Sequence, residues 1–158
     1  MPGKQSLYIG RAGQMAVMAE FLWRGWNVAV PEVDVGDDVF VVKDEGGDLW
    51  RVQVKTATAQ PQWQGYSAQF SLSLDQLEEP RAPDLVYVFA IRGSMSWEPF
   101  IVIDRKTLWQ EHREHGVGSA SRGNLILRFT VQNVEMRCSN RDFTAYRNDW
   151  SRWPVLVH

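Results

Sequence analysis

The stretch from Asp34 to Lys55 constrains the fold of this chain more than any other segment. It reads as an apolar strand, the turn Asp44-Glu-Gly-Gly-Asp48, and a second strand that carries Gln53 and Lys55. Two glycines flanked by acidic residues between β-rich runs predict a β-hairpin. Because successive side chains alternate between the faces of a strand, Gln53 and Lys55 share one face. We therefore expect the hairpin to bring both side chains close to Asp38, which precedes the first strand.

The polar side chains of this hairpin suit a particular chemistry. Burying an ammonium group without a partner is costly, so a lysine on a half-buried strand indicates that something nearby needs its charge. A carboxylate, a carbonyl oxygen and an ammonium that meet at one point suit a divalent cation and a phosphate group. The hairpin is therefore the first candidate for a functional site.

Apolar periodicity predicts the other elements of the chain. The expected strands cover residues 27–31, 39–42, 49–55, 66–74, 85–91, 99–103 and 125–131. The expected helices cover residues 11–24, 106–114 and, with weaker periodicity, 139–150. A flexible loop is expected at 116–123 because glycine and serine dominate it. This pattern indicates a mixed α/β fold with a leading helix and a central sheet.

The composition limits the kind of protein further. A chain of 158 residues with 44% apolar and 23% charged residues is typical of one globular domain, here 1–158. The single cysteine, Cys138, excludes an internal disulfide. The N-terminal segment has no apolar core of signal-peptide length, and no apolar run approaches the length of a membrane span. A cytoplasmic protein without a membrane segment is the simplest expectation.

The charge is unevenly distributed along the chain. The net charge is −2, yet residues 101–158 hold nine Lys/Arg against six Asp/Glu, a local charge of +3. The first hundred residues hold eight Lys/Arg and thirteen Asp/Glu, a local charge of −5. Carboxylates in the first half suit a metal site, and the basic second half could meet phosphates.

Glu20 lies on the predicted leading helix, four residues after Ala16, at the border of the apolar stripe. Together with the hairpin that carries Asp38, Gln53 and Lys55, this order resembles the PD-(D/E)XK nuclease superfamily. The chain looks most like the compact branch of archaeal Holliday-junction resolvases and small homing endonucleases. The resemblance covers residues 10–57, and residues 84 to about 108 also look like that branch. The expected single domain adds further core strands and a helix at 84–115 and a C-terminal strand and helix at 125–150 to the core motifs at 10–57. The resemblance implies a restriction-endonuclease-like core with a mixed central sheet flanked by helices.

The resemblance implies a role for each polar residue. Asp38 would be the principal metal-binding carboxylate, Gln53 would take the place of the usual Glu, and Lys55 would be the catalytic lysine. The backbone carbonyl of Val54 would be a further metal ligand, and Glu20 would match the glutamate of the first helix. The implied cofactor is Mg²⁺, with Mn²⁺ as the alternative.

Other residues compete for these roles. Asp34 and Asp37 lie close to Asp38, which is favoured because the apolar strand begins directly after it. Pro83-Asp84 and Asp104-Arg105-Lys106 match the superfamily formula more literally. Asp104, however, stands where a strand ends and a helix begins, the place of a helix N-cap, and Lys106 would lie on that helix. We therefore interpret the second match as a coincidence.

The resemblance implies a metal-dependent endonuclease that hydrolyses DNA phosphodiester bonds. Arg51, on the strand face of Gln53 and Lys55, and Arg122, in the 116–123 loop, are candidate phosphate contacts. One site per chain would need two copies to cut both strands of a duplex, so a homodimer is expected. The alternative is a non-catalytic module that keeps the nuclease fold and acts in DNA or protein binding or assembly. The uncharged Gln53 and a pI of about 5.9 favour that alternative.

Overall fold

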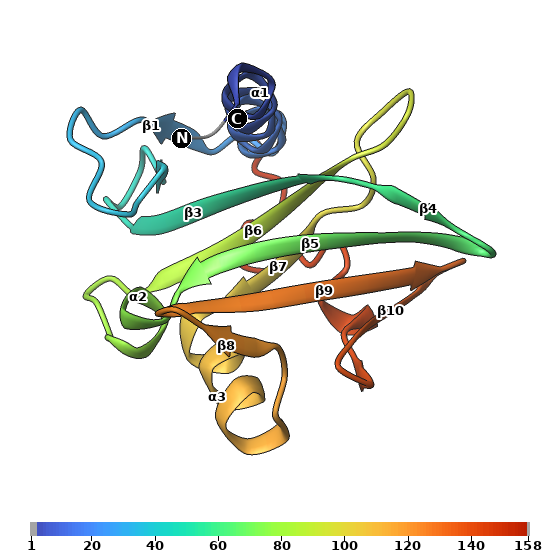
Figure 1. Ribbon diagram of the computed structural model, residues 1–158. Coiled ribbons are helices and arrows are strands. Elements are labelled where there is room, and N and C mark those ends of the chain that lie inside the picture. Colours follow the sequence, from blue (N-terminus) through green and yellow to red (C-terminus); the bar gives the residue numbers. More distant parts are fainter. Residues whose placement is uncertain (1–2, 158) are drawn as a thin grey trace.

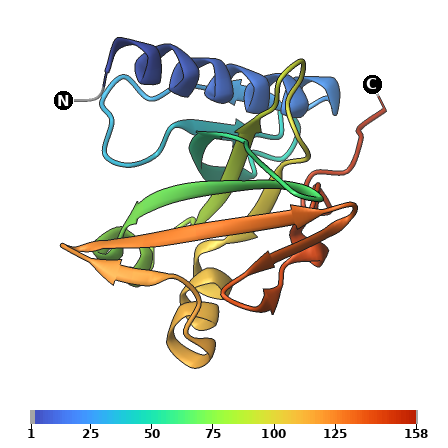
Figure 2. The same ribbon diagram turned by 45° about the vertical axis from the view of Figure 1, so that its right-hand side comes forward.

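Two β-sheets and a long N-terminal helix, α1 (Lys4–Trp23), form the framework of the protein (Figures 1 and 2). The computed structural model describes residues 3–157, so the ends of the predicted domain, Met1, Pro2 and His158, lie outside the described residues. One hydrophobic core lies between α1 and the first sheet, and another lies between the two sheets. Within the described residues, no helix combines the length and apolar character needed to cross a membrane.

The first sheet is mixed, as the sequence predicts. Its strand order is β1-β2-β3-β6-β7, in which β3 and β6 run parallel and the other neighbours are antiparallel. Strand β6 is buried along seven consecutive residues, which explains its almost continuous apolar sequence. The strands are β1 (Asn27–Ala29), β2 (Val39–Val42), β3 (Leu49–Thr58), β6 (Leu85–Arg92) and β7 (Ile101–Asp104).

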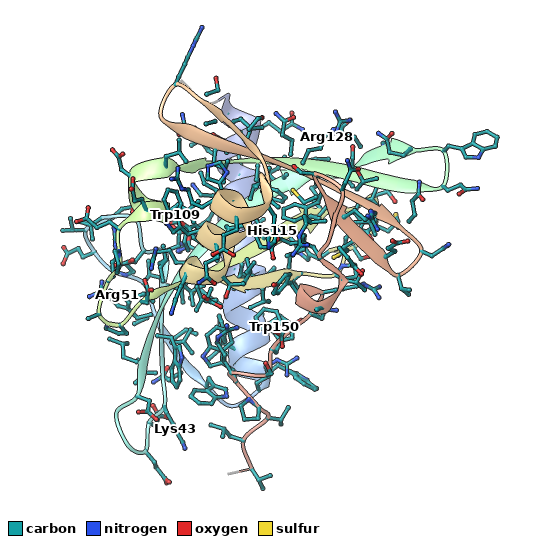
Figure 3. The ribbon with its side chains drawn as sticks, turned by 90° about the horizontal axis from the view of Figure 1, so that it is seen from below. Lys43, Arg51, Trp109, His115, Arg128 and Trp150 are labelled. Atoms are coloured by element: carbon teal, nitrogen blue, oxygen red, sulfur yellow. The ribbon has the colours of Figure 1, made fainter. Side chains whose placement is uncertain are left out.

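Helix α1 begins earlier than the sequence predicts and packs on one face of the first sheet. Gly13 permits the close approach, because a Cβ atom there would overlap the side chain of Thr56 on β3. The rings of Trp150 and Trp153 pack edge-on against Phe21, at centroid distances of 5.5 and 4.7 Å. Figure 3 shows Trp150 beside α1. The C-terminal segment therefore completes the core beneath this helix.

The second sheet is antiparallel and separate from the first, whereas the sequence predicts one central sheet. Its two long strands pair over nine residues, from Gly65 opposite Gln132 to Ser73 opposite Asn124. The pairing joins segments more than fifty residues apart, and hydrophobic periodicity carries no information about such partners. The strands are β4 (Gln60–Gln62), β5 (Gly65–Ser73), β8 (Ser119–Ser121), β9 (Asn124–Gln132), β10 (Glu135–Cys138) and β11 (Arg141–Asp142).

The helix predicted at 139–150 is wrong. The segment contains β11 and a single 3₁₀ turn, η1 (Thr144–Tyr146). Ser139, Asn140 and Asn148 have positive φ angles of 49°, 65° and 48°, which an α-helix does not accommodate. The predicted loop at 116–123 is partly wrong as well, because residues 119–121 form β8 and pair with β9.

Helices α2 (Leu74–Glu78) and α3 (Arg105–His115) contribute to the core between the sheets. Asp104 caps α3, with Oδ1 accepting from the Thr107 N–H at 2.8 Å, so the N-cap that the sequence predicts is confirmed. The Asp84 carboxylate accepts two hydrogen bonds from the Arg105 guanidinium, at 2.7 and 3.0 Å. Lys106 lies exposed on the helix. The literal motif at 83–106 is therefore a capped helix and an ion pair.

Candidate active site

The structure brings Asp38 and Gln53 together. The backbone N–H of Asp38 donates to the Val52 carbonyl at 2.9 Å, which holds Asp38 against β3. Its Oδ2 atom accepts from the Gln53 amide Nε2 and from the Val54 N–H, both at 2.8 Å. The contact arises because the β2–β3 hairpin forms as the sequence predicts.

Lys55 joins Gln53 on one face of β3. Val52 and Val54 belong to the core under α1, so Gln53 and Lys55 point to the opposite face. Both line a hollow of about 500 Å³, together with residues from β5 and α2. Gln53 is 7% exposed, and Lys55 is half-buried. An ammonium group thus stands at the wall of a small open cavity, beside a buried amide.

The environment of Asp38 disfavours its charged form. Burial is the largest cause and raises the pKa of Asp38 above its ordinary value, and the nearby carboxylates of Asp34 and Asp37 raise it further. The hydrogen bond from the Val54 N–H and the charge of Lys55 act in the opposite direction. A positive ion beside Asp38 would relieve this unfavourable burial.

Asp37 has a structural role instead. Its carboxylate is fully buried between two arginines, at 2.6 Å from Arg51 Nη1 and 2.8 Å from Arg81 Nη1. Arg51 is therefore engaged by Asp37, and its expected contact with a phosphate would have to share the guanidinium with this ion pair. Asp34 accepts from the Gly36 N–H at 2.8 Å and shapes the loop before β2.

Glu20 does not join the cluster, which contradicts its predicted place in the site. It lines a different hollow, with Trp97 and Trp150, and its carboxylate lies 3.9 Å from Arg24. The helix residue that reaches the cluster is Gln14, whose Nε2 donates to the Asp38 carbonyl at 2.7 Å. Six residues separate the two positions, about 9 Å along the helix axis, so only one of them can reach Asp38.

Sequence reasoning missed both Gln14 and Gln76. The only local signal for Gln14 is its neighbour Gly13, which marks where α1 approaches β3. Gln76 lies on α2, and its Nε2 donates to the Gly36 carbonyl at 2.7 Å and to Gln53 Oε1 at 3.4 Å. The Gln53 amide is thus held from both sides, by Asp38 and by Gln76. Nothing near Gln76 in the sequence indicates this contact.

Arg122 lies in the turn that joins β8 to β9. Its φ angle is +50°, and its side chain is exposed. The next residue, Gly123, accepts a backbone hydrogen bond from Leu74 at 3.0 Å, and Ser73 lines the hollow of Lys55. The turn therefore lies at the same end of the second sheet as the candidate site.

Asp38 is the carboxylate that this cluster offers to a divalent cation, and its pKa is raised. Gln53 directs its amide nitrogen at Asp38 and its amide oxygen at Gln76, so the amide must rotate before its oxygen can face a cation beside Asp38. The N–H of Val54 points at Asp38, and the carbonyl of the same strand residue points to that side too. Among residues 3–157, no group of three or more His, Cys, Asp or Glu side chains could hold a metal ion. A cation here would thus be held mainly by neutral oxygens, with modest affinity.

Comparison with solved structures identifies the type of fold. No family model matches the chain, and no curated protein sequence matches it. The structure of a bacterial homing endonuclease, I-Ssp6803I, is similar, with a TM-score of 0.60 and 18% identity over 95% of this chain and 93% of that chain. Hjc, a Holliday junction resolvase from Archaeoglobus fulgidus, matches with a TM-score of 0.46 and 11% identity over 78% of this chain and 84% of that chain. The protein therefore has a nuclease-like fold.

Proposed function

We propose that the protein is a metal-dependent endonuclease that hydrolyses DNA phosphodiester bonds at the cluster of Asp38, Gln53 and Lys55. The main support is a half-buried carboxylate, Asp38, whose charge interacts with that of Lys55, a half-buried lysine at an open hollow within a nuclease-like fold. Two copies of such a site would cut the two strands of a duplex, so the proposal includes a homodimer.

Each residue has a defined task in this proposal. The Asp38 carboxylate and the Val54 carbonyl would hold the cation, joined by the Gln53 amide oxygen once the amide rotates away from Gln76. Bound Mg²⁺ or Mn²⁺ supplies positive charge at the phosphate and lowers the pKa of the attacking water. Lys55 stabilises the negative charge that develops on the phosphate, or orients the water. The remaining contacts are positioning contacts: Gln14 holds the Asp38 backbone, and Gln76 holds the Gln53 amide.

The Lys55→Ala variant is expected to cleave DNA about 10²- to 10³-fold more slowly, as when a preorganised donor to a developing charge is removed. Conversion of supercoiled plasmid and of a four-way junction in Mg²⁺ or Mn²⁺ measures the rate. Lys106→Ala is the matched control, because Lys106 lies exposed on α3 within the literal motif, and it should cleave like the parent. Cleavage that survives Lys55→Ala but fails in Lys106→Ala would move the site to the second motif.

The Gln53→Glu variant tests the cation site without measuring activity. Without metal, a second carboxylate beside Asp38 should destabilise the fold by about 2 kcal/mol through burial and repulsion. Millimolar Mg²⁺ should raise the melting temperature of the variant more than that of the parent, because the added charge strengthens cation binding. Gln62→Glu, on the exposed strand β4, is the control and should show neither effect. An Mg²⁺ response no larger in Gln53→Glu than in the parent argues against a cation at Asp38.

The second candidate function is a non-catalytic module that uses the nuclease fold for DNA or protein binding. The hydrogen bond from Gln53 Nε2 to Asp38 favours it, because the amide presents a donor where a metal site needs an oxygen. Under this alternative, the parent protein binds DNA or a protein partner but cleaves no substrate with Mg²⁺ or Mn²⁺. The same plasmid and junction assays separate the two functions.

A further inference from the structure

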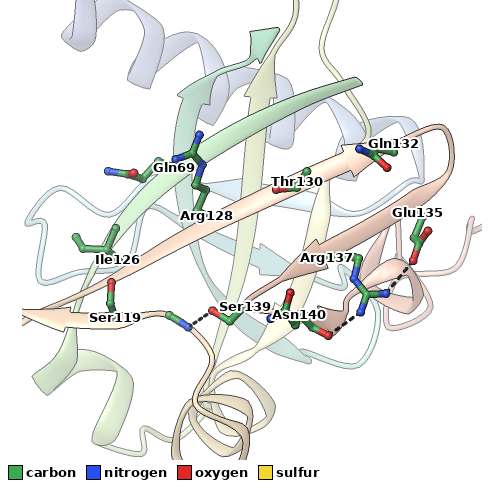
Figure 4. Close-up of a pocket in the computed structure, with 11 residues that line it drawn as sticks. Gln69, Ser119, Ile126, Arg128, Thr130, Gln132, Glu135, Arg137, Ser139 and Asn140 are labelled. Carbon is green, nitrogen blue, oxygen red and sulfur yellow. Dashed lines mark hydrogen bonds and ion pairs between the residues drawn. The ribbon is translucent and has the colours of Figure 1, made fainter. Parts of the chain in front are cut away.

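The second sheet has one face in the core and one in solvent. On β5 the even-numbered residues from Tyr66 to Leu72 face the core, and on β9 the odd-numbered residues from Leu125 to Val131 do so. The alternate residues of both strands point outward, and most of them are exposed. Figure 4 shows this outer face with a hollow of about 580 Å³ across β9 and β10.

Side chains that hydrogen-bond to base edges dominate the outer face. Gln69 lies directly opposite Arg128, and Thr130 lies opposite Arg137 on β10, whereas Ser67, also opposite Thr130, is buried. Glutamine, arginine, serine and threonine are the residues that read base pairs by hydrogen bonds. On the outer faces of β5, β9 and β10, Glu135 is the single carboxylate.

Arg128 stands out among the arginines of this face. Arg137, the other arginine on the outer faces of β5, β9 and β10, pairs with Glu135 at 2.9 Å and donates to the Asn140 carbonyl. Arg128, by contrast, makes a side-chain contact only with the hydroxyl of Ser67, at 3.5 Å, and within the described chain no carboxylate pairs with it. Its guanidinium is an exposed cation near the middle of a polar sheet face.

This face continues into the candidate active site. Strand β5 runs from the outer face to Ser73, its last residue, which lines the hollow of Gln53 and Lys55. Gln69, the cross-strand neighbour of Arg128, lies four residues before Ser73, about 13 Å along the strand. One duplex, in which base pairs are about 3.4 Å apart, can therefore contact both places.

We propose that the outer face of the second sheet binds the major groove of duplex DNA, with Arg128 as the principal base contact. The inference rests on the proposed function, because it assigns the recognition surface of that site. The major groove is about 12 Å wide and admits a two-stranded β-ribbon. At Gln69 and Arg128 only β5 and β9 pair, because β8 and β10 pair with other parts of β9 and β4 pairs with the start of β5. Arg128 pairs with a guanine by two hydrogen bonds, to O6 and N7, and Gln69 contacts the neighbouring base pair. Arg122, in the turn at the end of β9, contacts a phosphate.

The test is selection of binding sites from a library of randomised DNA duplexes, carried out in the Lys55→Ala background so that bound DNA stays intact. The Lys55→Ala protein with Arg128 intact, which is the parent in this experiment, is expected to enrich a motif that contains a guanine. Arg128→Ala should lose the preference for that base and bind the selected duplex on the order of tenfold more weakly, measured by fluorescence anisotropy. Arg128→Lys keeps the charge but cannot form the paired hydrogen bonds, so it should lose the same base preference.

Arg137→Ala is the matched control, because its guanidinium already has partners, and it should keep the motif with less than about threefold weaker binding. The proposal is overturned if Arg128→Ala keeps the parent motif, if the parent enriches no motif, or if the parent prefers RNA to duplex DNA. If any of these results occurs while the unsubstituted protein still cleaves plasmid, only the assignment of the recognition surface is rejected. If the unsubstituted protein does not cleave plasmid either, the proposed function is rejected as well.

Discussion

Replacing Asp38 with asparagine is expected to abolish DNA cleavage and to leave the fold at least as stable as the parent at neutral pH. The carboxylate is the one charged oxygen ligand of the proposed cation, and losing cation-based stabilisation of the transition state is worth several kcal/mol, a rate loss of about 10³-fold or more. An asparagine Oδ1 atom can still accept from Gln53 Nε2 and from the Val54 N–H, which now bond Asp38 Oδ2 at 2.8 Å. The hydrogen bonds that position this residue therefore survive.

The stability effect follows from the raised pKa of Asp38. Because burial makes the folded protein hold this proton more tightly than the unfolded chain does, protonation of Asp38 stabilises the fold. That contribution is present at low pH and is lost as the pH rises from the unfolded pKa, near 3.8, through the raised folded value. Above this window the parent carries a buried charge that Asp38→Asn removes. The gain in stability from the substitution should therefore appear at neutral pH and disappear at acidic pH.

Plasmid cleavage and urea unfolding at several pH values measure the two effects. A variant that loses cleavage and keeps its stability identifies Asp38 as a functional carboxylate, because a structural one would lose both. Strong destabilisation of Asp38→Asn at neutral pH would contradict this assignment, and retained cleavage would exclude Asp38 as a metal ligand.

The neighbouring substitution, Asp37→Asn, is expected to have the opposite effect. The Asp37 carboxylate is fully buried between Arg51 and Arg81, and neutralising it leaves two arginines without their partner. Breaking a buried ion pair by removing one partner costs about 3–5 kcal/mol. Both arginine side chains are 27% exposed, so the lower part of that range applies, about 3 kcal/mol.

Thermal unfolding measures this loss, which corresponds to a fall in melting temperature on the order of 10 °C. Below that temperature the variant should still cleave DNA, since Asp37 itself does not line the hollow of Lys55, although its partner Arg81 does. Asp34→Asn is the control, because Asp34 is exposed and only shapes a loop turn. If Asp37→Asn lost cleavage without losing stability, Asp37 and not Asp38 would be the functional carboxylate.

The local features of the site could be predicted because they depend on neighbours in the sequence. A Gly-rich turn between two apolar runs determines the hairpin, and the alternation of a strand determines that Gln53 and Lys55 share a face. The N-cap at Asp104 likewise depends on a strand end followed directly by a helix. Each of these predictions concerns residues within about twenty positions of one another.

The predictions that failed concern which element lies beside which. Periodicity places Glu20 at the border of the apolar stripe of its helix. Which residue of α1 reaches Asp38 depends on how the helix packs on β3 at Gly13, and that packing brings Gln14 to Asp38. The role predicted for Arg51 stays a prediction, but its ion pair with Asp37 could not be read from the sequence. Residues 139–150 do not form the predicted helix, because Phe143 and Trp150 are buried in different hydrophobic cores.

The sequence by itself therefore determined the hairpin, the shared face of Gln53 and Lys55, and the mixed α/β type of fold. Only the tertiary structure decided that a second sheet forms and that Gln76 holds the Gln53 amide. It also decided that no carboxylate of residues 3–157 pairs with Arg128 on its open face. The physical reason is the range of the interactions. Backbone propensity and side-chain alternation act between neighbours, whereas strand pairing, helix seating and ion pairing join residues far apart, whose positions depend on how the whole chain packs.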